Sequence, residues 1–220
     1  MSQIKEFVMA SARPLPVIVL ADVSGSMAND GKIGALNQAV AEMISTFAEE
    51  DDTRAEIQVS VITFGGKEAR LHKSLKPAAE ASWEAMSASG RTPLGEAFSL
   101  ARTMIEDQEI IPGRAYRPTL ILVSDGVPTD DWETSLKKLL SSERASKATR
   151  FAMAIGEDAD SRTLEAFLKD AGTRVFAAHE AREIKKFFRW VTMSVTSRSR
   201  SVNPNIVIDI DADALDDFDF

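Results

Sequence analysis

The sequence has 220 residues, of which 44% are hydrophobic and 27% are charged, a balance typical of a soluble globular domain with a full core. It has no cysteine and only two histidines, which excludes disulfides, thiolate zinc sites and a cysteine nucleophile and argues against a multi-histidine metal site. Six aspartates and no Lys or Arg stand in the last 18 residues, so the rest of the chain carries only -2 of the net -8, and no basic excess points to nucleic acid.

The beginning of the chain has no features of a targeting or membrane segment. Residues 1–16 include Glu6, Arg13 and two prolines, and they lack the basic start, apolar run and cleavage site of a signal peptide. No stretch reaches the ~18 consecutive apolar residues that a transmembrane helix needs. We therefore expect a cytoplasmic protein that has no contact with a membrane.

Strands and one helix are predicted over the first part of the chain. Residues 15–21 form a continuous apolar run rich in β-branched side chains, which predicts a buried strand. Over residues 32–48 apolar side chains recur every three or four positions, which predicts a helix. The alternating segment 56–64 predicts a second strand, joined by a hairpin to a third at 68–75. A short helix is expected around Trp83.

Helices and strands alternate over the second part of the chain. Each predicted strand is a short run of apolar and β-branched residues, and each predicted helix has apolar residues on one face. We expect helices at 94–110, 131–144, 161–172 and 180–197, and strands at 118–124, 150–156 and 173–178.

This alternation predicts an α/β fold of three layers. The sheet should be doubly wound and mostly parallel, with one antiparallel edge strand and helices on both faces, as in Rossmann-like folds. Residues 15–200 should form this domain, between an N-terminal extension at 1–14 and an acidic tail at 201–220. Ligands of such sheets bind beyond the carboxyl ends of the strands, near the point where the strand order reverses.

Small oxygen-bearing side chains stand at these strand ends. The stretch VLADVSGSM presents Asp22, Ser24 and Ser26 directly after the first strand. SGRTPLGEA places Thr92 before a helix, and VSDGVPTDD places Asp125 after a buried strand. Carboxylate and hydroxyl oxygens suit Mg²⁺, and also Mn²⁺ or Ca²⁺. We expect the five side chains to form a metal site, in which the two aspartates balance a divalent ion and one position stays open for an anion.

Capping roles also explain several of these residues when each is taken alone. Ser, Thr and Asp favour turns and helix N-caps, so the first loop could merely cap its turn and the following helix. Thr92 could be an N-cap before Pro93 at the first helical position. Asp130 and Asp131 are expected to begin the next helix, where they interact favourably with its dipole, or else to rim the metal site.

The three segments together resemble the signature of von Willebrand factor A domains, which is called the metal-ion-dependent adhesion site. The resemblance rests on Asp-x-Ser-x-Ser, a threonine that opens a helix and a later Ser-Asp-Gly, and it covers roughly residues 15–195. It implies that Ser24, Ser26 and Thr92 bind the metal more directly. It also implies that Asp22 and Asp125 act partly through bridging waters, and that a carboxylate of a partner protein takes the remaining position.

Among intracellular A domains, the stretches PVIVLADVSGSM and LVSDGVPTDDW are most similar to the bacterial tellurium-resistance (TerY-like) group. Members of that group are often encoded beside a protein kinase and a protein phosphatase, so the resemblance makes these two enzymes the expected partners. The expected function is a non-enzymatic, metal-dependent protein-binding module in a bacterial stress-signalling system.

Two other functions are compatible with the same motifs. A regulatory subunit of an ATPase or chelatase would use the same metal site with a different partner. A metal-dependent phosphohydrolase would use Asp22 as a nucleophile, but the usual second acid of such enzymes would fall at Ser24, and no glycine-rich phosphate loop is present.

The acidic tail also allows more than one role. It could be a solvated terminus, or its NIVIDI segment could add a strand to an exposed sheet edge. Its aspartates could meet the basic stretch of Arg182, Lys185, Lys186 and Arg189, or else Arg198 and Arg200. A tail carboxylate could also bind the metal of a neighbouring molecule, which would cause self-association.

Overall fold

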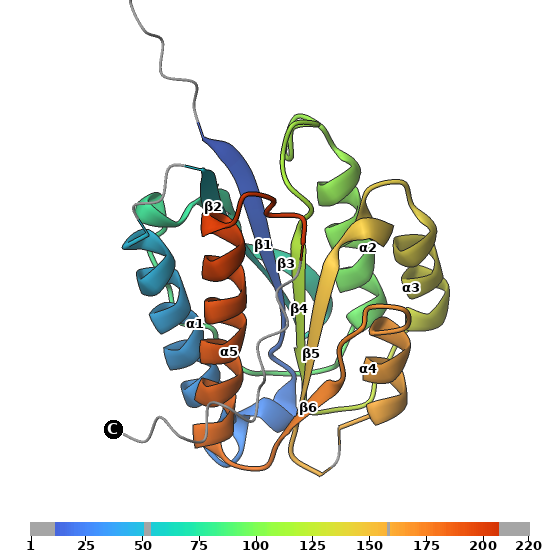
Figure 1. Ribbon diagram of the computed structural model, residues 1–220. Coiled ribbons are helices and arrows are strands. Elements are labelled where there is room, and N and C mark those ends of the chain that lie inside the picture. The colour runs from blue at the N-terminus through green and yellow to red at the C-terminus, as the bar shows by residue number, and fades with distance from the viewer. Residues whose placement is uncertain (1–11, 51–53, 158, 207–220) are drawn as a thin grey trace, which may run out of the picture.

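The computed structural model describes residues 12–50, 54–157 and 159–206 (Figure 1). These residues form a sheet of six strands in the order β3-β2-β1-β4-β5-β6, in which β3 alone is antiparallel to its neighbour. The strands are β1 (Arg13–Asp22), β2 (Ala55–Gly65), β3 (Glu68–Pro77), β4 (Thr119–Ser124), β5 (Thr149–Ile155) and β6 (Val175–Ala178).

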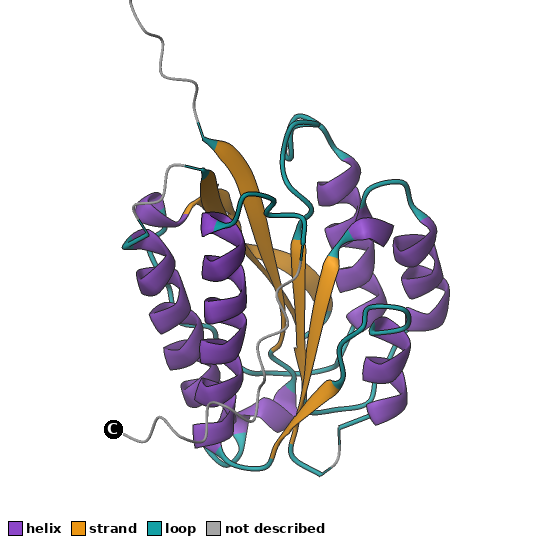
Figure 2. Ribbon diagram, in the orientation of Figure 1, coloured by secondary structure: helices purple, strands orange, loops and turns teal. Residues whose placement is uncertain are grey.

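Helices cover both faces of this sheet, which confirms the predicted three-layer, doubly wound α/β fold (Figure 2). One face is covered by α1 (Lys32–Ala48) and α5 (Ala181–Arg200). The other face is covered by α2 (Leu94–Glu106), α3 (Trp132–Ser141) and α4 (Ser161–Phe167). Short 3-10 helices lie at Gly25–Ala28, Ala78–Glu80 and Ala145–Lys147. Along the described ranges, no helix is long and apolar enough to cross a membrane.

The central strand β1 is buried on both sides, which explains why its sequence is continuously apolar. Alternate side chains point to opposite faces. Val17 and Val19 therefore pack in the core under α1 and α5. Ile18 and Leu20 pack in the core under α2, α3 and α4.

The short helix expected around Trp83 is wrong, because residues 81–89 are not helical. A single 3-10 turn at Ala78–Glu80 comes earlier. Asn37 on α1 explains the difference. Its side-chain amide donates to the Met86 carbonyl (2.9 Å), and its oxygen accepts from the Met86 N–H (2.7 Å). These bonds satisfy the backbone of a segment that forms no intrahelical bonds.

Several helices end earlier than their apolar spacing predicts. Helix α2 ends at Glu106 rather than near residue 110, because Asp107 has an extended backbone and its carboxylate accepts from the Glu109 N–H (2.8 Å). Helices α3 and α4 likewise end at Ser141 and Phe167. At the ends of α2 and α3, the local hydrogen bonds of Asp107 and Ser142 compete with helix continuation.

The strand order reverses beside β1, which pairs with β2 on one side and with β4 on the other. The carboxyl ends of β1 and β4 are therefore neighbours at the point where such a sheet opens a crevice. Asp22 ends β1, and Asp125 follows the last residue of β4.

Candidate metal centre

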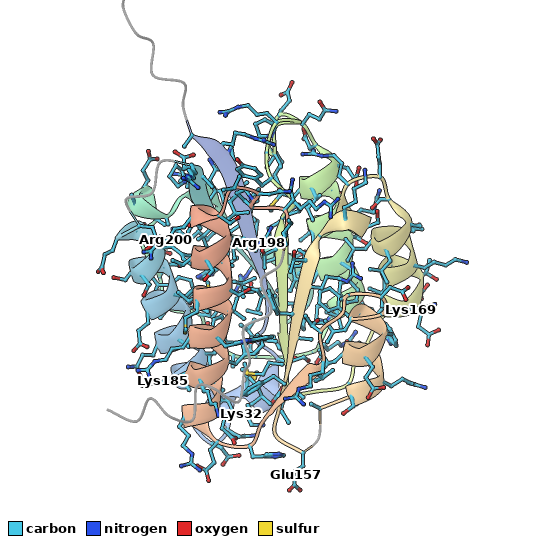
Figure 3. The ribbon with its side chains drawn as sticks, viewed as in Figure 1. Lys32, Glu157, Lys169, Lys185, Arg198 and Arg200 are labelled. Atoms are coloured by element: carbon cyan, nitrogen blue, oxygen red, sulfur yellow. The ribbon has the colours of Figure 1, made fainter. Side chains whose placement is uncertain are left out.

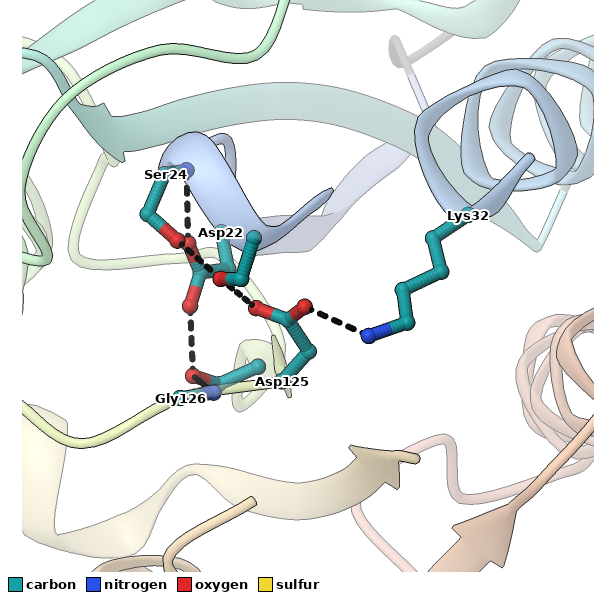
Figure 4. A network of polar contacts seen from close by, with 7 residues as sticks. Asp22, Ser24, Lys32, Asp125 and Gly126 are labelled. Carbon is teal, nitrogen blue, oxygen red and sulfur yellow. Dashed lines mark hydrogen bonds and ion pairs between the residues drawn. The ribbon is translucent and has the colours of Figure 1, made fainter. Parts of the chain in front are cut away.

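Asp22 is fully buried at the end of β1, and its carboxylate is held on both sides (Figure 4). Its Oδ1 accepts from the Ser24 backbone N–H (2.8 Å), and its Oδ2 accepts from the Ser124 hydroxyl (2.6 Å). Ser124 ends the neighbouring strand β4, so the parallel pairing of the two strands fixes this contact. The carboxylate therefore has a defined orientation within the crevice.

Serine hydroxyls connect this loop to the second aspartate. The Ser24 and Ser26 hydroxyl oxygens lie 3.0 Å apart, and the Ser26 hydroxyl donates to Asp125 Oδ1 (2.6 Å). The other Asp125 oxygen, Oδ2, accepts from Lys32 Nζ at 2.9 Å, and the Asp125 side chain is fully buried. Figure 4 shows the network between the two carboxylates, with Lys32 reaching it from α1.

Thr92 reaches the same place from a third loop. Its side chain is buried, and its Oγ1 lies 3.8 Å from the position that a Cβ on Gly126 would occupy. The Ser26 hydroxyl oxygen lies at the same distance from that position. The structure therefore brings all five predicted residues to one edge of the sheet: Asp22, Ser24, Ser26, Thr92 and Asp125.

Glycine backbones hold the loop of Ser24 and Ser26 close to the loop of Gly90, and hold the loop of Gly90 close to the turn at Gly66. The Gly25 N–H donates to the Gly90 carbonyl (3.0 Å), and the Arg91 N–H donates to the Gly66 carbonyl (3.0 Å). Gly90 has a φ of +71°, and a Cβ there would lie 2.5 Å from the Gly66 Cα. Only glycine fits at Gly90 without movement of the backbone. This close approach places Thr92 beside the loop of Ser24 and Ser26.

The predicted capping role of Thr92 is wrong. The N-cap of α2 is Pro93, and the N–H groups of Gly95 and Glu96 donate to the Asp130 carboxylate, each at 3.0 Å. Thr92 is instead held through its backbone, because its N–H donates to the Thr129 hydroxyl (3.2 Å) and its carbonyl accepts from the Thr129 N–H (3.0 Å).

The structure also tests the capping roles predicted for Ser24, Asp130 and Asp131. Ser24 is the N-cap of the 3-10 helix but makes no side-chain cap, and its hydroxyl lies beside that of Ser26. Asp131 caps α3 as expected, since it accepts from the Thr134 N–H (3.2 Å). Asp130, also predicted at the start of α3, caps α2 instead, so its carboxylate is directed to the N-terminus of α2 rather than to the loop of Ser24 and Ser26.

The charges of this site are not balanced by its own residues. Burial raises the pKa of the Asp22 carboxyl above its ordinary value, hydrogen bonds from Ser124 and Ser24 oppose that shift, and the charge of Asp125 adds to it. Lys32 is the cation that contacts Asp125. Two carboxylates and one ammonium leave a formal charge of -1 in a buried place, where an additional cation would be favourable.

The donor set fits a hard divalent cation. It consists of two carboxylates and three hydroxyls, and oxygen ligands of this kind suit Mg²⁺, Mn²⁺ and Ca²⁺. The structure as described, residues 12–50, 54–157 and 159–206, has no group of three or more His, Cys, Asp and Glu side chains placed to hold a metal. A site here therefore depends on hydroxyl ligands.

Two residues that contact the predicted set were missed from the sequence. Ser124 lies within the Ser-Asp-Gly motif, and its position directly before Asp125 on a buried strand is a usable signal. Lys32 gave no such signal, because a lysine at the first position of an amphipathic helix usually contacts solvent. Only the fold brings it to Asp125.

The comparisons with known proteins agree with this geometry. The family model described as von Willebrand factor type A domain matches residues 17–127, which is half of the chain and includes all five predicted residues. No curated protein sequence matches the chain.

Solved structures share the fold at low sequence identity. A von Willebrand factor type A protein from Catenulispora acidiphila is 19% identical with a TM-score of 0.63, and the match covers 86% of this chain and 43% of that one. The pilus adhesin SpaC from Lactobacillus rhamnosus GG is 14% identical with a TM-score of 0.67, and the match covers 85% and 30%. Proximal thread matrix protein 1 from the mussel byssus, solved with a zinc-occupied MIDAS motif, is 16% identical with a TM-score of 0.60, and the match covers 84% and 48%.

This chain thus spans less than half the length of these solved proteins, and at such identities the likeness shows the fold. The family match provides sequence evidence for membership of the family, and it covers the strands and loops that contain the five predicted residues. The chain therefore belongs to the von Willebrand factor type A domain family.

Proposed function

We propose that this protein is a metal-dependent protein-binding module, in which Asp22, Ser24, Ser26, Thr92 and Asp125 hold a divalent cation, with Mg²⁺ as the first choice. The observation that carries the proposal is the network in which serine hydroxyls connect two buried carboxylates. The zinc-occupied MIDAS motif of the mussel protein supports a divalent metal at this place in the fold.

The charge of the site supports an acidic partner. Asp22, Asp125 and Lys32 together carry -1, so a bound divalent ion would make the site +1. When bound, the cation supplies a Lewis-acidic position that a carboxylate of another protein can take. The chain's own residues would hold the ion, and the loops around Gly25, Gly90 and Gly126 would contact the partner and supply specificity.

The signalling context remains part of the proposal. The resemblance of the first and third motifs to the tellurium-resistance (TerY-like) group supports a protein kinase or a protein phosphatase as the partner, in the cytoplasm of a bacterium. A regulatory subunit of an ATPase or chelatase is the alternative with the same site. The adhesive role of SpaC, a pilus adhesin, supports partner binding in general without naming the partner.

One observation favours a second candidate function. Lys32 lies 2.9 Å from Asp125 and in the same network as Asp22, and a phosphohydrolase could use such a lysine to bind phosphate. Two features make this reading weaker. Position 24 is a serine where a second acid would be needed, and the Lys32 ammonium is already paired with Asp125.

The test captures partners from an extract of the source cells with the full chain as bait, in Mg²⁺ or in EDTA. We expect bound proteins that EDTA releases, that Ser26→Ala fails to capture, and that Ser45→Ala, a control on the exposed side of α1, still captures. Replacement of one Asp or Glu of the partner should abolish binding. Identical capture in EDTA would contradict the proposal. Turnover of a generic phosphate ester that is lost in Asp22→Ala would favour the phosphohydrolase.

A further inference from the structure

A groove lies between α1 and α5, and we call it the α1–α5 groove. Its volume is about 920 Å³. Four basic side chains of α5 line it: Arg182, Lys185, Lys186 and Arg189. Its floor includes three apolar side chains, of which Met43 and Phe188 are buried and Met193 is 43% exposed.

The acidic residues of the groove do not neutralise all of this positive charge. Glu183 accepts from the Glu180 N–H (2.9 Å) as part of the capping box of α5, and Glu42 accepts from the Gln38 side chain (2.9 Å). Arg182 pairs with Glu180 at 3.0 Å in an exposed position. Neither Lys185 nor Arg189 has an acidic partner within the described part of the chain. The groove therefore offers cationic groups beside an apolar floor.

The tail of the same chain has the complementary composition. Residues 207–220 contain six aspartates and no lysine or arginine. Their sequence, VIDIDADALDDFDF, interleaves these acids with isoleucine, alanine, leucine and phenylalanine. A segment of this kind can place apolar side chains on the groove floor and carboxylates beside its cations.

The tail is long enough to reach the whole groove. The described chain ends at Ile206, close to the end of α5, where Asn205 accepts from the Arg117 N–H (2.8 Å) and Pro204 accepts from Arg198 (2.8 Å). Helix α5 has 20 residues and is therefore ~30 Å long. The 14 residues that follow Ile206 can span ~46 Å when extended, which exceeds the length of α5.

The structure also reduces the number of basic sites that the tail could meet. Arg198 is fully buried, and Arg200 pairs with Glu50 in two hydrogen bonds. Both lie toward one end of α5, whereas Lys185 lies toward the other end (Figure 3). Of the two basic sets on α5, the stretch from Arg182 to Arg189 is the one that lines a groove.

We propose that residues 207–220 fold back and occupy the α1–α5 groove of their own chain. Aspartate carboxylates pair with Lys185 and Arg189, and apolar tail residues pack on the exposed Met193. The docked tail runs from the end of α5 toward the edge of the sheet that carries Asp22. This proposal does not depend on metal binding or on the proposed function.

Spin-label distances in the full chain test this directly, because the natural sequence has no cysteine. One nitroxide is attached at Ala214→Cys in the tail and a second at Ser45→Cys in the groove. The matched control pairs Ala214→Cys with Ser141→Cys, another exposed helical serine, on α3 across the sheet. We expect a short, narrow distance distribution for the groove pair and a longer one for the control pair.

Charge reversal distinguishes docking from chance proximity. The double variant Lys185→Glu/Arg189→Glu should broaden the groove distance, and so should 1 M salt, where the Debye length is about 3 Å. Lys137→Glu/Lys138→Glu on α3 changes the charge equally and should have no effect. Equally broad distributions for both label pairs would refute the proposal. A groove distance that disappears on dilution with unlabelled chain would also refute it, because the tail would then occupy a second copy.

Discussion

Strand β4 binds a buried charge at each of its ends. The hydroxyl of its first residue, Thr119, accepts from Arg198 Nη1 (2.6 Å), and the hydroxyl of its last residue, Ser124, donates to Asp22 (2.6 Å). Both charged side chains are fully buried. Figure 3 places Arg198 toward one end of the molecule and Lys32, which contacts the acidic network, toward the other.

The two ends differ in how the charge is satisfied. Arg198 donates to three neutral oxygens, those of Thr119, Pro204 and Arg117, and it joins α5 to β4 and to the segment after α5. Burial, with a smaller contribution from the charge of Arg117, lowers its pKa to about 10, so it stays charged at neutral pH. Each nitrogen of the Arg198 guanidinium has an acceptor, so this buried charge needs no ligand from solution. Its role is structural.

At the end of β4 where Asp22 and Asp125 lie, two like charges are buried together, and the one ammonium that contacts them does not neutralise both. Asp22 and Asp125 are linked through serine hydroxyls, and Lys32 contacts Asp125 alone. A buried charge with neutral partners completes the fold, whereas two buried like charges are stabilised further by an ion from solution. This comparison predicts which substitutions cost stability and which change ligand binding.

The largest loss of stability should follow Arg198→Met. Three oxygens would lose their donor, two of them in buried hydrogen bonds and one in a partly buried hydrogen bond. Each buried unsatisfied group costs ~1–3 kcal/mol, so the free energy of unfolding should fall by about 3 kcal/mol. Urea unfolding measures this. Arg200→Met is the control from the same turn of α5. Its pair with Glu50 is 61% exposed on the arginine side, so the loss should stay below ~1 kcal/mol. Equal losses would contradict the structural role of Arg198.

A smaller loss should follow Gly90→Ala, at the acidic end. The new Cβ would lie 2.5 Å from the Gly66 Cα at a φ of +71°, so the loops must separate, at a cost of about 2 kcal/mol. Gly172→Ala has a similar φ of +73° with nothing within 4 Å, so it isolates the backbone strain of about 1 kcal/mol. Only Gly90→Ala should also weaken the stabilisation by Mg²⁺. Equal behaviour of both variants would show that the glycine contact does not position the site.

Lys32→Met should have the smallest effect on the stability of the fold. Unlike Gly90→Ala, it should strengthen the binding of Mg²⁺. Removal of the ammonium leaves Asp125 without its cation, so the metal-free protein should be less stable. A divalent ion would then no longer be repelled by the Lys32 ammonium, so its affinity should rise about tenfold, or ~1.4 kcal/mol. Calorimetric titration with Mg²⁺ measures this, with Lys137→Met as the control. A weaker affinity would show that Lys32 supports the metal instead of competing with it.

Most of the fold could be predicted from the sequence because the apolar residues of its strands and helices follow clear spacing patterns. The continuous apolar run of β1 and the one-sided helices α1 and α5 alone indicate a buried parallel sheet covered by helices. The segment around Trp83 could not be predicted, because a distant side chain, Asn37, holds it in a nonhelical conformation. Helix ends such as Glu106 depend on local hydrogen bonds that apolar spacing does not register.

The candidate site was predictable only in part, because some of its contacts join residues that are far apart in the sequence. Asp22, Thr92 and Asp125 belong to motifs at element ends, where sequence patterns are informative. The contact of Lys32 with Asp125 joins residues 93 positions apart, and the Asp130 caps on α2 join residues 34 and 35 positions apart. Such contacts follow from the strand order, which local patterns do not specify.

The pH dependence of the metal-free protein separates Asp22 from the other acids. Its pKa is raised in the folded state, so the stability that its protonated form contributes is present below its ordinary value of 3.8 and is lost as pH rises through the folded pKa. Asp22→Asn has no such charge. In EDTA this variant should therefore be more stable than the wild type at neutral pH, and the difference should vanish in acid.

Thermal unfolding of the wild type and Asp22→Asn, in EDTA and in Mg²⁺, tests the cation site most directly. At ~100 times its dissociation constant, the metal should stabilise the wild type by roughly 2.7 kcal/mol. We predict that Asp22→Asn, although more stable in EDTA, loses this shift. An equal shift in both proteins would place the metal elsewhere, and no shift in the wild type would show that the buried acids do not form a divalent cation site on their own.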